Sequence, residues 1–210
     1  MKGIMDYYDK TALEWAKMSY TPDPEIPALL DFARRFPPGS RFLDLCCGCG
    51  CESQRIHAMG YEVVGLDFSE ESLKIARERN PDIVFYQDDL RNDYSYIGKV
   101  DAVIVIAGLV HIEKDQLPLA FSRMRDVMKD EGRLFITVRE GQGKIEKRSQ
   151  YIVDGETYDR AFFGHSLEEL QAAASGMFAF EQGMGDDGTG WHNYIFTTVK
   201  EKESKKRTGK

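Results

Sequence analysis

Apolar and polar positions follow two alternating patterns along this chain. Short apolar runs are separated by longer stretches whose apolar residues recur every three or four positions, as on one face of a helix. This order predicts βαβ units and a mostly parallel sheet. The unbroken β-branched run VIVIA within 101–107 indicates a strand buried at the middle of that sheet. The strands are expected at residues 41–45, 62–67, 83–87, 101–107 and 133–138.

Helices are expected between these strands and ahead of the first one. Ser69 is placed to cap one helix, and Ser166 with Glu169 forms a capping box for another. The runs 177–181 and 194–199, joined by a loop over 183–190, predict a terminal antiparallel hairpin. The segments with helical spacing are 7–18, 26–36, 52–59, 70–79, 115–129 and 167–174.

These elements predict an α/β fold: a single Rossmann-like domain over residues 1–199 with helices on both faces of the sheet. With 210 residues, of which 42% are hydrophobic, the chain can bury one sizeable core. We expect residues 1–39 to form a helical cover. Residues 140–165 are too long for an ordinary strand-to-helix connection, so we expect an insert or lid there. The charged tail 200–210 is expected to be disordered.

The charge balance excludes some partners. The net charge is −7, although the tail 200–210 holds six Lys or Arg against two Glu, so the remaining chain is more acidic still. Such a body is a poor partner for a long nucleic acid. No apolar run approaches the roughly 18 to 20 residues of a membrane span, and the start has no signal-peptide pattern. We expect a cytoplasmic protein without a membrane partner, as a monomer or homodimer.

The four cysteines Cys46, Cys47, Cys49 and Cys51 fall within six residues. They are too close together for a disulfide framework and suit a reducing compartment. A zinc site commonly takes two separated ligand pairs, and no second cluster of Cys or His follows. We therefore expect no metal.

Acidic residues stand where three predicted strands end. Asp44 precedes a loop with glycines at 48 and 50, Asp67 ends the next strand, and Asp88 and Asp89 follow the third. Ligands of open α/β sheets bind beyond these strand ends. The dinucleotide fingerprint fails because its third glycine would fall at Ser53, and a pyrophosphate would meet acids there rather than bases. The net positive charge of S-adenosylmethionine suits these acids better, although aspartates also cap helices and turns.

Five segments resemble successive motifs of the class I S-adenosylmethionine-dependent methyltransferases, and the resemblance covers roughly residues 7–199. It is strongest to the branch that acts on small molecules. The resemblance implies a seven-stranded sheet whose last strand is antiparallel. The segments are FLDLCCGCG, VVGLDFSEESLKIARER, VFYQDDLRN, VDAVIVIAGLVHI and GRLFITVREGQG.

The resemblance also implies roles for particular residues. Asp44 and the backbone of Cys46 and Gly48 would hold the methionine part of the cofactor, and Asp67 would hold the ribose. One departure is that Cys46 replaces the first glycine of the family's Gly-x-Gly-x-Gly loop, so the loop path is expected to differ slightly. The remaining cofactor contacts implied are Phe68 and Leu90 against the adenine, Asp89 at its amino group, and Ala107 at the floor of the site.

Fewer sequence features indicate which residues would bind the methyl acceptor. No Asp/Asn-Pro-Pro-aromatic motif of amino-group methylation follows the fourth strand, but His111 lies near its end. A histidine there could act as general base, since its unperturbed pKa is near neutrality, or could be a loop residue satisfied by backbone groups. Residues expected to wall the acceptor pocket, unless they serve only packing, are Tyr8, Tyr151, Arg160 and Trp191.

The sequence thus predicts methyl transfer from S-adenosylmethionine to a small-molecule acceptor. Two alternatives remain open. One is a protein that binds S-adenosylmethionine or S-adenosylhomocysteine without turnover, and the other is a nicotinamide-dependent oxidoreductase.

Overall fold

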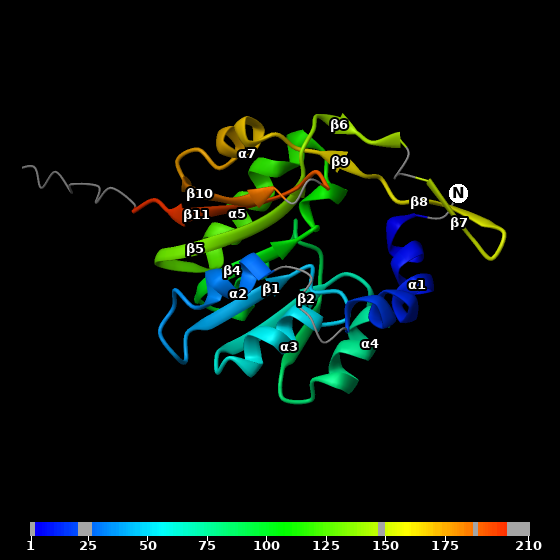
Figure 1. Cartoon of the computed structure of the whole chain (residues 1–210), viewed down its shortest axis with the longest axis horizontal. Coiled ribbons are helices and arrows are strands. Elements are labelled where there is room, and N and C mark those ends of the chain that lie inside the picture. Colours follow the sequence, from blue (N-terminus) through cyan, green and yellow to red (C-terminus); the bar gives the residue numbers. More distant parts are fainter. Residues whose placement is uncertain (1–2, 21–26, 147–149, 187–188, 201–210) are drawn as a thin grey trace, which may run out of the picture.

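Seven strands form one sheet at the centre of the molecule (Figure 1). The computed structural model describes residues 3–20, 27–146, 150–186 and 189–200. The strand order is β10-β11-β5-β4-β1-β2-β3, and β11 runs antiparallel to both of its neighbours while the other neighbouring pairs are parallel. The predicted fold class is confirmed, with β4 at the middle. The strands are β1 Arg41–Leu45, β2 Glu62–Asp67, β3 Val84–Gln87, β4 Val100–Ile106, β5 Met128–Arg139, β10 Phe178–Asp186 and β11 Trp191–Thr198.

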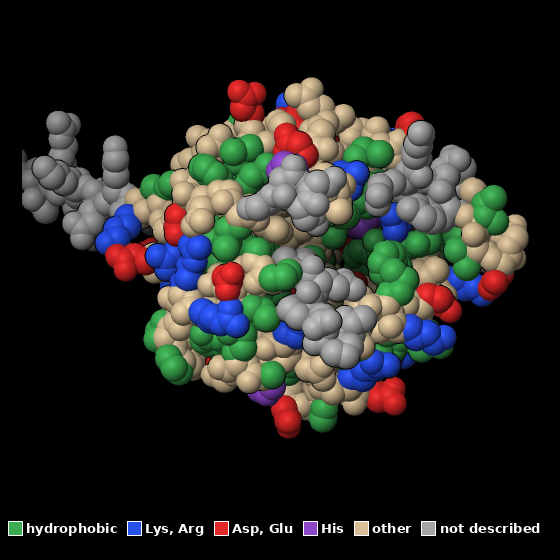
Figure 2. All heavy atoms as spheres, viewed as in Figure 1, with side chains coloured by type: hydrophobic (Ala, Val, Ile, Leu, Met, Phe, Trp, Pro, Cys, Tyr) green, Lys and Arg blue, Asp and Glu red, His purple; other side chains and the backbone are tan. Residues whose placement is uncertain are grey.

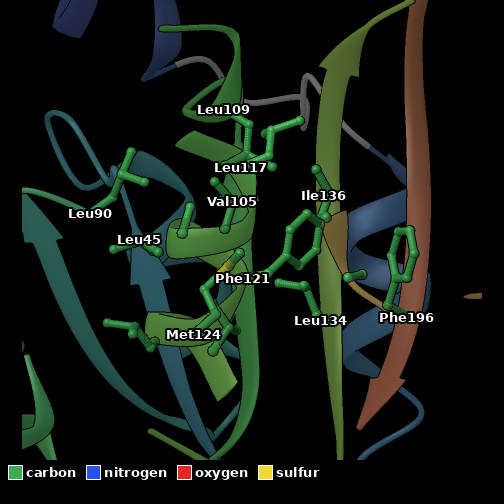
Figure 3. Close-up of a cluster of buried hydrophobic side chains, with 14 of the residues drawn as sticks. Leu45, Leu90, Val105, Leu109, Leu117, Phe121, Met124, Leu134, Ile136 and Phe196 are labelled. Atoms are coloured by element: carbon green, nitrogen blue, oxygen red, sulfur yellow. The ribbon is translucent and has the colours of Figure 1, made fainter. Parts of the chain in front are cut away.

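Helices cover both faces of this sheet. Helices α5 and α7 bury their apolar residues on one face, and α2, α3 and α4 bury theirs on the other. Phe121 and Met124 of α5 point toward Leu134 of β5 and its neighbours (Figure 3). The helices are α1 Ile4–Ser19, α2 Pro27–Ala33, α3 Cys51–Ala58, α4 Glu70–Arg79, α5 Leu117–Val127 and α7 Leu167–Ala173, with 3₁₀ turns at Ser95–Ile97, Leu109–His111 and Lys114–Gln116.

The predicted caps explain where two helices begin. The Ser69 side chain accepts a hydrogen bond from the backbone N–H of Ser72, and Ser166 with Glu169 closes a capping box at α7. Each such cap is worth about 1 kcal/mol because it satisfies a backbone donor that the helix leaves open. The buried side chains of α5 stabilise the fold more than the caps do, since each fully buried Leu or Phe contributes about 1.5 to 3 kcal/mol.

Helix α1 packs against α4 and against the insert. Asp9 accepts hydrogen bonds from Ser69 Oγ at 2.7 Å and from the Glu71 N–H at 3.3 Å, which ties α1 to the start of α4. The insert consists of two short antiparallel pairings rather than a plain loop, and Figure 1 shows α1 beside the second of them. The pairings join β6 Gly143–Lys144 to β9 Phe163–Gly164, and β7 Gln150–Val153 to β8 Glu156–Asp159.

Three strand boundaries differ from the prediction by more than one residue. Strand β5 begins at Met128 rather than 133, with a register shift against β4 and a left-handed backbone at Glu131 (φ 64°). Strand β10 runs to Asp186, inside the expected loop 183–190, and β11 begins at Trp191 rather than 194, because cross-strand pairing with bulges continues past Gly183. Of the predicted disordered tail 200–210, only Lys200 lies within the described residues.

Candidate active site

A cavity of about 890 Å³ opens at the carboxyl ends of the parallel strands. Figure 2 shows a hollow near the middle of the face in view, with hydrophobic side chains at its rim. Every residue predicted to contact the cofactor lines this cavity, namely Asp44, Cys46, Gly48, Asp67, Phe68, Asp89, Leu90 and Ala107.

The lining divides into two parts. We call the lining residues within 44–52, 67–72, 89–91 and 106–108 the strand-end half. The aromatic half comprises Tyr8, His111, Ile112, Arg160, Phe162 and Trp191, which come from α1, the segment after β4, the insert and β11. Tyr151 lies in β7, but its side chain is outside the described part of the structure, so its predicted place in the pocket stays a prediction.

The loop after β1 adopts a tight path along the floor of the cavity. Cys46 has φ 64°, in the left-handed region that a glycine occupies more cheaply, and Ala107 after β4 has φ 55°. The sequence predicted a slightly different loop path because a cysteine replaces a glycine at position 46. In the structure, Cys46 has the left-handed backbone conformation that is typical of glycine. A Cβ on Gly108 would lie 2.7 Å from Cys46 Sγ, so the loops after β1 and β4 pack together only because residue 108 is glycine.

Asp67 joins the loop after β1 to the end of β2. Its Oδ2 accepts a hydrogen bond from the Gly48 N–H at 2.8 Å, and its Oδ1 accepts one from the Ser69 N–H at 2.9 Å. Burial raises the pKa of Asp67 to about 6, although these backbone hydrogen bonds oppose the rise. A carboxylate has about four lone-pair positions, so Asp67 keeps acceptor capacity for a ligand hydroxyl.

Asp44 is more deeply buried than Asp67 and has a hydroxyl partner. Ser53 Oγ donates a hydrogen bond to Asp44 Oδ2 at 2.5 Å. Burial raises the pKa of Asp44 to about 7, the bond from Ser53 opposes that rise, and the nearby charge of Glu52 adds to it. Two carboxyls with raised pKa values therefore face one cavity, and a cationic ligand would favour their ionised forms.

Only one of the two tandem acids after β3 reaches the cavity. Asp89 lines it and accepts two side-chain hydrogen bonds from Arg91, at 2.8 and 2.6 Å. The bonds from Arg91 lower the pKa of Asp89 and keep it ionised. Asp88 instead accepts hydrogen bonds from Asn92 and Tyr96.

His111 and Tyr8 form a hydrogen-bonded pair in the aromatic half. His111 Nδ1 lies 3.0 Å from the Ala161 carbonyl oxygen, which can only accept, so this nitrogen carries the proton. His111 Nε2 then accepts a hydrogen bond from the Tyr8 hydroxyl at 2.8 Å. Burial lowers the pKa of His111 to about 4, well below the unperturbed value near neutrality that a general base would use. Burial also raises the pKa of Tyr8, which keeps its hydroxyl protonated.

Arg160 supplies a buried positive charge to the same half. The residue is 3% exposed, and its guanidinium carbon lies 5.1 Å from the ring centres of both Tyr7 and Phe162. The Phe162 ring also meets Trp191 edge to face at 6.0 Å. These contacts place the predicted residues Arg160 and Trp191 on either side of Phe162, although they lie 31 positions apart in the sequence.

Sequence reasoning missed several lining residues. Thr137 of β5 donates a hydrogen bond to Asn193 of β11 at 2.7 Å, and both side chains line the cavity. Their pairing depends on the register of β5 with β11, which local periodicity does not reveal. The other missed residues include Ile4, Met5, Trp15, Pro27, Ala28, Glu52, Arg91 and Met184.

The described residues contain no group of three or more His, Cys, Asp or Glu arranged to hold a metal ion, and the four cysteines are free thiols. Burial raises the pKa of all four thiols, which keeps them protonated. Within the same residues, no helix combines the length and apolar character needed to cross a bilayer.

Comparison with known proteins finds similar methyltransferases. A family model described as a methyltransferase domain matches residues 42–132. The chain is 35% identical over 142 residues, 65% of its length, to a putative methyltransferase, YqeM, of Bacillus subtilis. It is also 35% identical over 99 residues, 47% of its length, to a demethylmenaquinone methyltransferase of Renibacterium salmoninarum. The chain spans only 54% and 41% of these two relatives.

A similar solved structure is a complex of DhpI with S-adenosylhomocysteine. It superposes with a TM-score of 0.73 at 20% identity and covers 93% of this chain and 95% of that one. This likeness supports the fold. The matches above show that the chain is similar to methyltransferases over the first strands of the sheet and the helices between them.

Proposed function

We propose that this protein transfers the methyl group of S-adenosylmethionine to a small-molecule acceptor. The observation that carries the proposal is that buried acids at the strand ends and an aromatic wall with Tyr8 and His111 line the same cavity. The Renibacterium relative is named for a small acceptor, demethylmenaquinone, which supports this acceptor class.

The strand-end half fits S-adenosylmethionine as the cofactor. Asp44 and Asp67 are buried carboxyls with raised pKa values, and a ligand with a sulfonium and an ammonium group would stabilise their charged forms. Asp67 would accept from the ribose, and Asp44 with the backbone of Cys46 and Gly48 would hold the methionine part. The bound cofactor supplies a methyl group attached to a good sulfonium leaving group.

The strand-end half would also hold the adenine of the cofactor. We propose that Phe68 and Leu90 pack against the adenine, that Asp89 accepts from its amino group, and that Ala107 forms the floor. All four line the cavity. Asp89 retains acceptor capacity beside Arg91 because each of its oxygens has two lone pairs.

The aromatic half would receive the acceptor. Methyl transfer is a single displacement, so the protein contributes chiefly alignment and exclusion of water. We propose that His111 holds the Tyr8 hydroxyl toward the acceptor rather than removing a proton itself. An imidazole with a pKa near 4 is a weak base at neutral pH, and its Nε2 is engaged by Tyr8.

The test is to titrate the protein with S-adenosylmethionine, S-adenosylhomocysteine and NAD by calorimetry, then to assay S-adenosylhomocysteine release across an acceptor panel. We expect micromolar binding of the first two, none of NAD, and release with at least one acceptor. Cofactor binding without release from any acceptor would favour the non-catalytic binding protein. NAD binding alone would favour the oxidoreductase.

A further inference from the structure

The Tyr8 hydroxyl offers lone pairs to a ligand, because its hydrogen is already donated inside the protein. His111 Nδ1 faces the Ala161 carbonyl oxygen, which can only accept, so this nitrogen carries the single proton of the neutral ring. His111 Nε2 is then an acceptor, and the Tyr8 hydroxyl donates its hydrogen to it at 2.8 Å. Within the described chain, no second hydrogen bond involves the Tyr8 hydroxyl. The Tyr8 oxygen therefore keeps its capacity to accept.

A second hydroxyl in the cavity wall has the same polarity. Asn193 Nδ2 donates a hydrogen bond to the Met184 carbonyl oxygen at 3.3 Å, which orients the amide so that its Oδ1 faces Thr137. The Thr137 hydroxyl donates to that Oδ1 at 2.7 Å, so its hydrogen also has an acceptor within the protein. Two separate hydrogen-bond chains thus end at backbone carbonyl groups, and each leaves a cavity-lining hydroxyl with lone pairs to offer.

We propose that the methyl acceptor is an uncharged ring compound whose reacting group, a hydroxyl or an amine, donates its hydrogen to the Tyr8 oxygen. The inference rests on the proposed methyl transfer and narrows its acceptor. An ether, a ketone or a carboxylate has only lone pairs, so two acceptors would face each other at Tyr8 without a hydrogen between them. A protonated amine also donates, but its nitrogen has no lone pair to attack the methyl carbon.

The wall around Tyr8 indicates the shape of the rest of the acceptor. The His111 ring meets the Tyr8 and Phe162 rings edge to face, with ring centres 5.5 Å apart in both pairs. Together with Trp191, these rings line a cavity of about 890 Å³, near the upper end of the usual range of about 300 to 1,000 Å³ for small-molecule sites. Aromatic rings pack well edge to face or offset against one another. A compact, flat ring system beside the cofactor matches this wall.

Methylation removes the hydrogen that Tyr8 would recognise. In a hydroxyl acceptor, the oxygen bonds to the methyl carbon, the electron pair of the breaking carbon–sulfur bond passes to sulfur, and the hydroxyl proton is released to water. The resulting ether has no hydrogen to donate to Tyr8. An amine first becomes a methylammonium ion and then loses a proton to water, and it remains an acceptor while it keeps an N–H group. The site thus distinguishes the acceptor from its fully methylated product.

The experiment compares matched probes by calorimetry at pH 7 on protein saturated with S-adenosylhomocysteine. The hydroxyl arm is 2-naphthol with 2-fluoronaphthalene and 2-methoxynaphthalene, and the amine arm is aniline with fluorobenzene and N,N-dimethylaniline. The fluorine compounds lack the donor at nearly the same size, and the methylated compounds represent products. In at least one arm, we expect the donor to bind about fivefold or more tightly than both of its partners. That arm identifies the reacting group as a hydroxyl or an amine.

Two variants test the polarity of the Tyr8 hydroxyl. Tyr8→Phe should abolish the preference by weakening the binding of the donor probe. His111→Phe should abolish it in the opposite way, because a Tyr8 hydroxyl without its acceptor can donate to the methylated probe and strengthen the binding of that probe. The affinity for S-adenosylhomocysteine should change by less than about threefold in both variants. Tyr94→Phe is the matched control, because Tyr94 does not line the cavity and its loss of a hydroxyl should leave the preference intact.

The outcomes separate this inference from the proposed function. A wild-type protein that binds S-adenosylhomocysteine but prefers the donor probe in neither arm overturns the inference alone. A preference that survives in a folded Tyr8→Phe protein overturns the role of Tyr8. Failure to bind S-adenosylhomocysteine overturns the proposed function instead. If the variants do not fold, nitrogen-15 NMR of the native protein decides, since a proton on His111 Nδ1 is expected and a proton on Nε2 would overturn the inference.

Discussion

The strand-end half and the aromatic half are built in different ways. The strand-end half comes from four loops that each follow a strand of the same parallel sheet, so sheet register alone brings its members together. The aromatic half draws Tyr8 from α1, Arg160 from the insert and Trp191 from β11, three parts of the chain outside the parallel core. The first arrangement follows from the fold, whereas the second depends on additions to it. We therefore expect the strand-end half to determine cofactor binding and the aromatic half to determine the acceptor.

The largest effect is expected at Asp67, which serves both the loop and the ligand. Asp67→Asn removes a charged acceptor and places an N–H₂ group opposite the N–H of either Gly48 or Ser69, so cofactor affinity should fall by about 1.5 to 3 kcal/mol. Calorimetry with S-adenosylmethionine measures the change. Asp88→Asn is the matched control, because Asp88 does not line the cavity. Equal dissociation constants for the two variants would show that Asp67 only begins a turn.

Substitutions at His111 should lower turnover and leave the affinity for the cofactor nearly unchanged. If His111 positions Tyr8, His111→Gln and Tyr8→Phe should each lower kcat/KM by about tenfold, the value of one hydrogen bond. The dissociation constant for S-adenosylhomocysteine should move less than about threefold in either variant. If His111→Gln lowers kcat/KM by about 10²-fold or more, and the activity of the native protein falls as pH drops through a histidine pKa, then His111 is a general base after all.

Cofactor affinity should depend on pH through the strand-end half. Burial raises the pKa of Asp44 to about 7 and that of Asp67 to about 6, so both carboxyls are largely protonated in the free protein below pH 6. A cationic ligand prefers the ionised forms, and binding therefore releases protons. Affinity for S-adenosylmethionine should rise by up to about tenfold per pH unit for each carboxyl and should level off above pH 7. A flat profile between pH 5 and 8 would contradict this.

The same two carboxyls should affect the stability of the free protein in the opposite direction. Their folded-state pKa values exceed the unfolded value of about 3.9, so their stabilising contribution is complete below about pH 4 and is lost as pH rises to about 7. The melting temperature of the free protein should therefore gain from Asp44→Asn at pH 8 more than at pH 5. A gain that is equal at both pH values would mean that Asp44 titrates normally.

The smallest effect on stability and cofactor affinity is expected from removing the C-terminal tail, whose residues belong to neither half of the cavity. Removing residues 201–210 leaves every described cavity residue in place and should change the free energy of unfolding by no more than about 0.5 kcal/mol. Thermal unfolding with and without S-adenosylhomocysteine provides the measurement. A loss of cofactor affinity in the shortened chain would show that the tail contributes to the site.

The sequence predicted the strand-end half well because its information is local. An apolar strand, an acid at its end and a small-residue loop together define the positions of Asp44, Gly48 and Asp67. Tyr8 and His111 were proposed separately, but their hydrogen bond spans 103 positions and depends on how α1 packs. The lowered pKa of His111 was likewise out of reach, because burial causes it and periodicity does not report burial of a loop residue.

The division of the cavity into a cofactor half and an acceptor half is tested most directly by a crystal structure with S-adenosylhomocysteine bound. We expect the ribose hydroxyls within hydrogen-bond distance of Asp67, the adenine between Phe68 and Leu90, and the sulfur directed toward Tyr8 and Arg160. A ligand bound in the reverse direction, or with its adenine in the aromatic half, would contradict the account.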